Sequence, residues 1–278
     1  RRAQTLKCPI YDEDFVRIEL SQVSEINSIK AIADPSLDLK NPLKGPFNIR
    51  RDKPLKLENE ALLLLKSAQL LPAAVISKVT KGKDYATLHS LTYLQQLQLE
   101  ETALQSKDIA DAISAQVPTA RAENTQFHIF RPNISGEEHY AIEIGKIDRD
   151  KATLVRIHSA CFTGDVLGSL KCDCGPQLHA ATRMINDQGG GLLIYLNQEG
   201  RGIGLANKIR AYALQDQGFD TVDANHRLGF EDDERDFQLA ATILSDMRIS
   251  NIKLITNNPS KISTIDKYNI TVTERIPL

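Results

Sequence analysis

The sequence predicts an α/β fold of the α+β type, in which a main domain of mixed sheet with packed helices follows a small N-terminal α/β domain. The first observation is that β-branched runs alternate with segments of helical periodicity beyond about residue 120. The second is that residues 1–55 are rich in Pro, Gly, Asp and Asn, which is typical of turns. We therefore expect an accessory domain at residues 1–115 and the main domain at residues 116–278.

The N-terminal domain is expected to hold three helices and one strand. Residues 57–71, LENEALLLLKSAQLL, have helical periodicity and end at Pro72, and residues 73–79, AAVISKV, are typical of a strand. Residues 91–104 and 107–116 are expected to be helices. No catalytic signature falls in these segments, so the role of this domain stays open.

Strands and helices alternate through the main domain. Runs rich in β-branched residues predict strands at Gln126–Arg131, Tyr140–Ile147, Thr153–His158, Gly191–Leu196 and Asn251–Thr256. Apolar residues at helical spacing predict helices at Gln177–Asp187, Ile203–Gln217, Asp236–Met247 and Ser260–Tyr268. Strands that are followed by helices indicate an α/β domain, and antiparallel strands are expected where the domain begins.

Composition excludes several classes of protein. The formal net charge of −2 provides no basic surface for a nucleic acid or an anionic membrane. The longest apolar runs are far too short to span a bilayer, and the first residues lack the apolar stretch of a signal peptide. Four cysteines in 278 residues are too few for a disulfide scaffold. We expect a cytoplasmic protein with reduced thiols.

Three of the four cysteines lie together in HSACFTGDVLGSLKCDCG, residues 158–175. Cys172 and Cys174 are two residues apart, and Cys161 lies one loop away. Clustered thiolates in a reduced compartment favour Zn²⁺. Three interpretations remain open on spacing alone: buried cysteines, a structural zinc site closed by His158 or His179, or a catalytic zinc with an open position.

Two turns between a strand and a helix have the residues of an anion site. Gly200, Gly202 and Gly204 in QEGRGIGLANK allow close approach of the backbone, and Arg201 adds a fork-shaped donor. The spacing matches neither the dinucleotide-binding nor the P-loop motif. In the second turn, TNNPSK, Thr256 ends the strand and Lys261 begins the helix. Lys261 favours a nearby anion there, although it could equally be a solvated surface lysine.

An acidic loop follows in NHRLGFEDDERDF, residues 225–237, with four consecutive carboxylates before Arg235. A solvated loop is the usual explanation for such a run. A catalytic explanation needs one carboxylate as a proton acceptor and the arginine facing a phosphate.

Taken together, these stretches resemble GTP cyclohydrolase II, with an N-terminal extension like that of some bacterial members. The matching stretches, in family order and spacing, are RIHSACFTGDVLGSLKCDCGPQL, QEGRGIGLANKIRAYALQDQGFDTVDANHRLGF, DDERDF and TNNPSK. They cover the catalytic domain of that family except its usual C-terminal tail. The resemblance implies zinc-dependent hydrolysis of GTP to 2,5-diamino-6-ribosylamino-4(3H)-pyrimidinone 5′-phosphate, formate and pyrophosphate, the first step of riboflavin biosynthesis.

The resemblance also assigns residues to roles. It makes Cys161, Cys172 and Cys174 the ligands of one zinc ion per chain, with water completing the shell. Tyr212 matches a tyrosine implicated in ring opening, although it could simply pack against Ile209. Asp233 is assigned as the proton acceptor, and Arg235 as a nucleophile toward the α-phosphate or as an electrostatic clamp. The residues that the resemblance assigns to GTP contact are Arg156, His158, Ser159, Gln177, Glu199, Gly200, Arg201, Thr221, Thr256 and Lys261.

Partners and alternatives follow from the same resemblance. GTP is the expected substrate, read at guanine by Glu199, with Mg²⁺ at its triphosphate. A homodimer is expected. The chain departs from the family at Ala160, where glutamate is usual, and at Leu196 and Asn197, where basic residues are frequent. The alternatives are therefore a non-catalytic zinc-containing regulatory or scaffold homologue, and a hydrolase that stops at the formamide product.

Overall fold

The structure is a computed structural model that describes residues 2–9, 15–20, 25–53, 55–95, 109–132, 137–257, 262 and 265–278. Its backbone forms two compact units, which we call the helical unit, Arg1–Glu100 with Gly200–Glu234, and the sheet unit, Glu101–Glu199 with Arg235–Leu278. This division differs from the one expected at residue 115, because residues 200–234 join the N-terminal residues.

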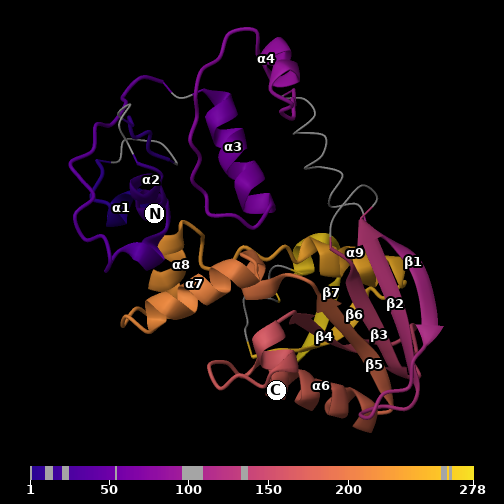
Figure 1. The fold of residues 1–278 in the computed structure, drawn as a ribbon. Helices are drawn as coiled ribbons and strands as arrows, with labels where there is room; N and C mark the ends of the chain where they lie inside the picture. The colour runs from indigo at the N-terminus through magenta and orange to yellow at the C-terminus, as the bar shows by residue number, and fades with distance from the viewer. Residues whose placement is uncertain are drawn as a thin grey trace. The chain divides into compact units, whose positions relative to one another are not determined.

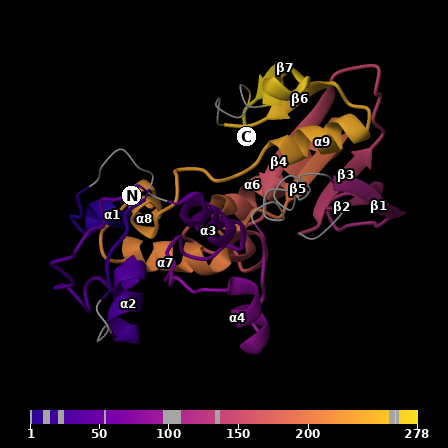
Figure 2. The same cartoon turned by 90° about the horizontal axis from the view of Figure 1, so that it is seen from above.

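The sheet unit is built on a seven-stranded mixed sheet in the order β1-β2-β3-β5-β4-β6-β7 (Figures 1 and 2). Its strands are β1 (Ile109–Gln116), β2 (Thr125–Pro132), β3 (His139–Gly145), β4 (Thr153–Ser159), β5 (Gly190–Leu196), β6 (Asn251–Ile255) and β7 (Thr271–Ile276). Antiparallel pairs join β1, β2, β3 and β5, whereas β5, β4, β6 and β7 pair in parallel. The sheet is therefore antiparallel where the domain begins, as predicted.

Two helices cover opposite faces of this sheet (Figure 1). Helix α6 (Cys174–Asp187) packs Ala181 and Ile185 against one face, and α9 (Gln238–Asp246) packs Ile243 and Leu244 against the other. Successive strand residues point to opposite faces, so Leu154 joins the α6 side whereas the next residue of β4 joins the α9 side. A central strand covered on both faces explains why β4 is almost wholly buried.

The helical unit combines the N-terminal helices with two helices from residues 200–234. Its helices are α1 (Arg2–Thr5), α2 (Ile26–Ala33), the 3₁₀ turn η1 (Pro35–Leu37), α3 (Lys56–Ser67), α4 (Gly82–Leu88), α7 (Leu205–Gln215) and α8 (Thr221–Leu228). Its core contains Ile203, Leu214, Leu228 and Phe230, with Leu71 and Phe219 packed against them. Helix α8 begins where the Asp220 carboxylate accepts from Asp223 N at 2.8 Å.

Most of the predicted elements of the main domain are confirmed. All five predicted strands and three of the four predicted helices form, with ends that differ by up to three residues. Of the fourth, Ser260–Tyr268, the part that the structure describes ends in the 3₁₀ turn η4 (Asp266–Tyr268), and residues 258–261, 263 and 264 lie outside the described residues. The glycine turn, η3 (Glu199–Gly202), is kinked and is not a regular helix, because Gly200 and Arg201 have non-helical backbone angles.

Several predictions for the first part of the chain are wrong. The helix expected at 107–116 is strand β1, because pairing with β2 overrides the helical propensity of IADAISAQ. The strand expected at 73–79 is irregular chain, so the described N-terminal residues form helices and loops with one isolated bridge, Ile18 to Ile49. Helix α3 confirms the prediction for 57–71. Of the helix expected at 91–104, residues 91–95 are irregular and the remainder lies outside the described residues.

Among the described residues, no helix combines the length and the hydropathy that a membrane crossing requires.

Candidate metal centre and substrate residues

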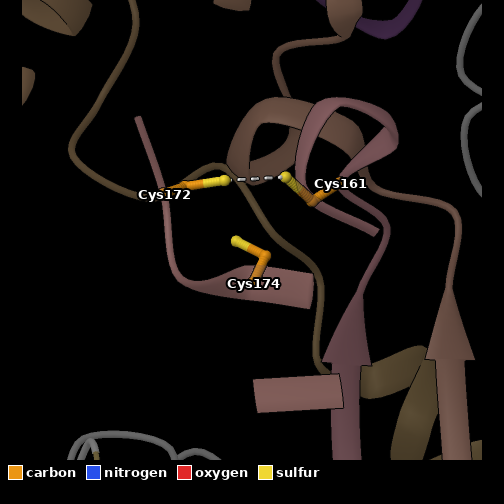
Figure 3. A group of neighbouring side chains, drawn as sticks. All are labelled: Cys161, Cys172 and Cys174. Carbon is orange, nitrogen blue, oxygen red and sulfur yellow. Dashed lines mark hydrogen bonds between the residues drawn. The ribbon is translucent and has the colours of Figure 1, made fainter. Parts of the chain in front are cut away.

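Three cysteines converge where β4 ends and α6 begins (Figure 3). Cys161 follows β4, the π-helical turn η2 (Phe162–Val166) reverses the chain, and Cys174 is the first residue of α6. The Sγ atoms of Cys161 and Cys172 are 3.6 Å apart, and all three sulfur atoms lie within 4.8 Å of one another. The loop thus gathers residues that are separated by up to 13 positions into one sulfur cluster.

The surroundings of the sulfur cluster fit a divalent metal ion. Burial and the neighbouring Cys161 and Cys172 raise the pKa of the Cys174 thiol, so three thiolates need a cation between them. Gly164 is required beside them, since a Cβ there would lie 2.8 Å from Cys172 Sγ and 3.0 Å from Cys161 Sγ. Three thiolates are a donor set that zinc prefers.

Neither His158 nor His179 joins the three cysteines as a fourth possible metal ligand. Within the described part of the chain, the three cysteines form a metal-competent group by themselves, without His158 or His179. His158 instead directs Nε2 to the Asp165 carboxylate at 3.0 Å, and its ring stacks on Tyr195 with centroids 5.4 Å apart. This geometry disfavours a structural zinc site that is closed by either histidine.

Asp165 organises the cysteine loop and is absent from the residues that the sequence predicted. Its carboxylate accepts from Cys161 N at 3.0 Å and from the Tyr195 hydroxyl at 2.9 Å, and it faces His158. Burial opposes ionisation, but these hydrogen bonds hold the pKa of Asp165 below its usual range. Burial and the bond to Asp165 raise the pKa of Tyr195, which therefore stays a donor. A carboxylate between two of the three clustered cysteines is the sequence signal that could have identified it.

Several predicted substrate residues meet at the carboxyl ends of the parallel strands. Arg156, 5% exposed on β4, donates to Ile255 O at 3.0 Å and to Gln177 Oε1 at 2.9 Å. Thr256, just after β6, is also buried. Among the described residues, the buried Arg156 Nε and Ser159 Oγ have no hydrogen-bond partner. Ligands of open α/β sheets bind at this edge, so the two unused polar atoms are available to a ligand.

Two other predicted residues of the sheet unit lie near this edge. The Glu199 carboxylate accepts from Phe162 N at 2.6 Å, so it contacts the residue directly after Cys161. The Arg235 guanidinium lies over the Phe237 ring at 5.2 Å. Burial lowers the pKa of Arg156 and the charge of Arg235 lowers it further, whereas Cys174 and Asp173 raise it. Like-charged guanidinium groups at one edge favour an anionic partner.

The remaining predicted site residues belong to the helical unit, except Lys261. Gly200 and Arg201 both have left-handed backbone, with φ of 65° and 63°, which is costly for arginine. The ammonium group of Lys208 lies over the Tyr212 ring at 5.7 Å, the Thr221 hydroxyl accepts from Gln215 at 3.0 Å, and Asp233 is exposed. Lys261 lies outside the described residues.

Comparison with known proteins shows the family of this chain. A family profile described as GTP cyclohydrolase II matches residues 110–277. The "GTP cyclohydrolase-2" of Azospirillum brasilense is 39% identical over 282 residues, which cover all of this chain and 73% of that protein. The chain belongs to the GTP cyclohydrolase II family. The family predicted from the motifs is thereby confirmed, and the chain is an enzyme of this type.

Two further proteins are similar to parts of this chain. The "Riboflavin biosynthesis protein RibBA" of Bacillus cereus is 53% identical over 146 residues, which are 52% of this chain and 37% of that protein. A solved structure of RibBX, a two-domain 3,4-dihydroxy-2-butanone 4-phosphate synthase from A. baumannii, has a TM-score of 0.36 and 14% identity. The match covers 73% of this chain and 50% of that chain.

Proposed function

We propose that this chain hydrolyses GTP in a zinc-dependent reaction that opens the imidazole ring and releases formate and pyrophosphate. The product is 2,5-diamino-6-ribosylamino-4(3H)-pyrimidinone 5′-phosphate, the first intermediate of riboflavin biosynthesis. The observation that carries the proposal is the cluster of Cys161, Cys172 and Cys174 within 4.8 Å, inside the segment that matches the family.

The three cysteine thiolates would hold one zinc ion. A zinc ion in such a site lowers the pKa of water and polarises the bond under attack. The chain's own contribution is to keep the loop in place: Asp165 fixes Cys161 N, and Glu199 accepts from the next backbone N–H. Gly164 leaves the space that the sulfur atoms occupy.

GTP suits the unused donors of the sheet unit. Its triphosphate is anionic, and the buried Arg156 Nε and Ser159 Oγ have donor capacity without a partner in the described structure. The resemblance adds His158, Gln177, Thr256 and Lys261 as contacts, Glu199 as the reader of guanine N1–H and the 2-amino group, and Gly200, Arg201 and Thr221 from the helical unit. Mg²⁺ would offset the charge of the triphosphate.

Three residues are proposed for the chemistry. Tyr212 would act in ring opening, and Asp233 would accept a proton. Arg235 would act on the α-phosphate; a guanidinium is protonated at every physiological pH, which favours an electrostatic clamp over a nucleophile. A homodimer and a functional division near residue 115 are also part of this proposal.

An anaerobic assay of zinc-quantified protein with GTP and Mg²⁺ tests the proposed function. Formate, pyrophosphate and the pyrimidine absorbance should rise together at about one zinc per chain. ATP in place of GTP is the control for the recognition of guanine. Bound zinc without turnover would indicate a regulatory or scaffold homologue, and pyrophosphate without formate would indicate an incomplete reaction.

A further inference from the structure

The N-terminal residues and the segment 200–234 share one hydrophobic core. Leu71, which follows helix α3, packs against the cluster that Ile203, Leu214, Leu228 and Phe230 form within 200–234. That segment also carries Tyr212 and Asp233. Two residues proposed for the chemistry are therefore placed by a core that the N-terminal region helps to close.

Helix α7, which carries Tyr212, is tied to the N-terminal residues at two positions. The fully buried Asn207 donates from Nδ2 to Gln69 O at 2.8 Å. One helical turn along, Arg210 donates from Nε to the Asp34 carboxylate at 3.0 Å. A side chain at Gly204, where φ is +84°, would overlap Gln69, so the glycine turn approaches this residue closely.

The acidic loop is held on both sides of Asp233. On one side, Arg201 donates to Asp232 O at 3.4 Å. On the other, Glu234 N donates to Arg201 O at 3.0 Å, and the Glu234 carboxylate pairs with Lys66 of helix α3 at 2.8 Å. The Lys66 ammonium also lies 5.8 Å from the Phe230 ring centre, and both side chains of the ion pair are about three-quarters buried.

We propose that the described N-terminal residues of the helical unit act as an intramolecular support for the segment that carries Tyr212 and Asp233. We also propose that Lys66 is a positioning residue for the acidic loop. Lys66 fixes Glu234, and through it the conformation of the preceding Asp233. The kinetic part of this inference rests on the proposed function, whereas the structural part does not.

The test compares Lys66→Met with Lys56→Met in the full chain. Lys56 lies on the same helix, is 67% exposed and pairs with Glu60 of that helix at 3.6 Å, so it is a matched control. Hydrogen–deuterium exchange of residues 230–234 and steady-state kinetics with GTP are both measured. Lys66→Met should speed exchange there and lower kcat about fivefold at unchanged KM, whereas Lys56→Met should change neither.

A double-mutant cycle with Glu234→Gln separates the ion pair from general destabilisation. The effects of Lys66→Met and Glu234→Gln on exchange should be less than additive, since both remove one interaction. The positioning role would be overturned if Lys66→Met left the exchange of residues 230–234 unchanged. It would also be overturned if the wild-type protein were active and Lys66→Met left kcat unchanged or raised only KM. If the wild-type protein releases no formate, the proposed function fails, and the exchange cycle decides the role of Lys66 by itself.

Discussion

At the scale of single residues, the arrangement of the sulfur cluster depends on side chains other than the three cysteines. Asp165 joins the backbone of Cys161 to His158 and Tyr195, so one carboxylate orients a predicted metal ligand and a predicted substrate contact. Residues that orient ligands in this way tune metal affinity in proteins.

Asp165→Asn should weaken zinc binding by about 10- to 100-fold, because the amide has one acceptor oxygen instead of two and removes the negative charge that faces His158. Competition with a chromophoric chelator at neutral pH measures this without reference to turnover. Asp148→Asn, an exposed carboxylate paired with Lys151, serves as the control. Equal zinc affinity in the wild type and Asp165→Asn would remove this role.

Cys172→Ser should reduce bound zinc from about one ion per chain to near none and abolish formate release, since a serine hydroxyl is a poor replacement for a thiolate. Elemental analysis gives the zinc content. Cys8→Ser removes a thiol that is buried outside the cluster and should keep the metal. Stoichiometric zinc in Cys172→Ser would exclude Cys172 from the ligand set.

At the scale of elements, helix α8 was not predicted, and residues 225–228, which were expected to begin a loop, form its last turn. Asp220 caps its first turn, and Gly229, with φ of +90°, ends it. Its inward face supplies Ala224 and Leu228 to the core of the helical unit.

Asp220→Ala should lower the free energy of unfolding of the helical unit by about 1 kcal/mol, because Asp223 N loses its partner. Urea unfolding followed by circular dichroism measures the change. Asp216→Ala, at the carboxyl end of α7, should not destabilise the protein, because a negative charge is unfavourable there. A loss equal to that of Asp220→Ala would contradict the capping role.

At the scale of the whole molecule, stability should depend on pH through a buried histidine of the sheet. His139 is 5% exposed, and its Nδ1 accepts from Asn197 N at 3.1 Å, so its buried ring is neutral. Burial lowers its pKa from 6.5 to about 4. Below pH 6.5 His139 therefore binds a proton in the unfolded chain, whereas in the folded chain it stays neutral until the pH falls to about 4.

As the pH falls through this window, His139 alone should cost up to about 3 kcal/mol of unfolding free energy. His139→Asn keeps an acceptor for Asn197 N but does not titrate, so its stability should fall less steeply between pH 6.5 and 4. Urea unfolding at several pH values compares the two proteins. Identical slopes would show that His139 is not the responsible group.

Local pattern predicted the parts of this protein in which neighbouring residues suffice. Five strands followed from β-branched runs, helices α6, α7 and α9 from apolar spacing, and the sulfur cluster from cysteines within 14 residues of one another. The motifs in these segments also identified the family.

Tertiary structure decided what depends on partners distant in the sequence. Segment 109–116 became a strand because β2 pairs with it, and Asp165 gained its role only when β5 brought Tyr195 to its carboxylate. Residues 200–234 form one unit with the N-terminal helices because they contact Lys66, Gln69 and Leu71, which precede them by more than 130 positions in the sequence. Composition and spacing determined which chemical groups the chain contains. Long-range packing determined which side chains hold those groups in place, because burial and hydrogen bonding depend on neighbours that local sequence does not specify.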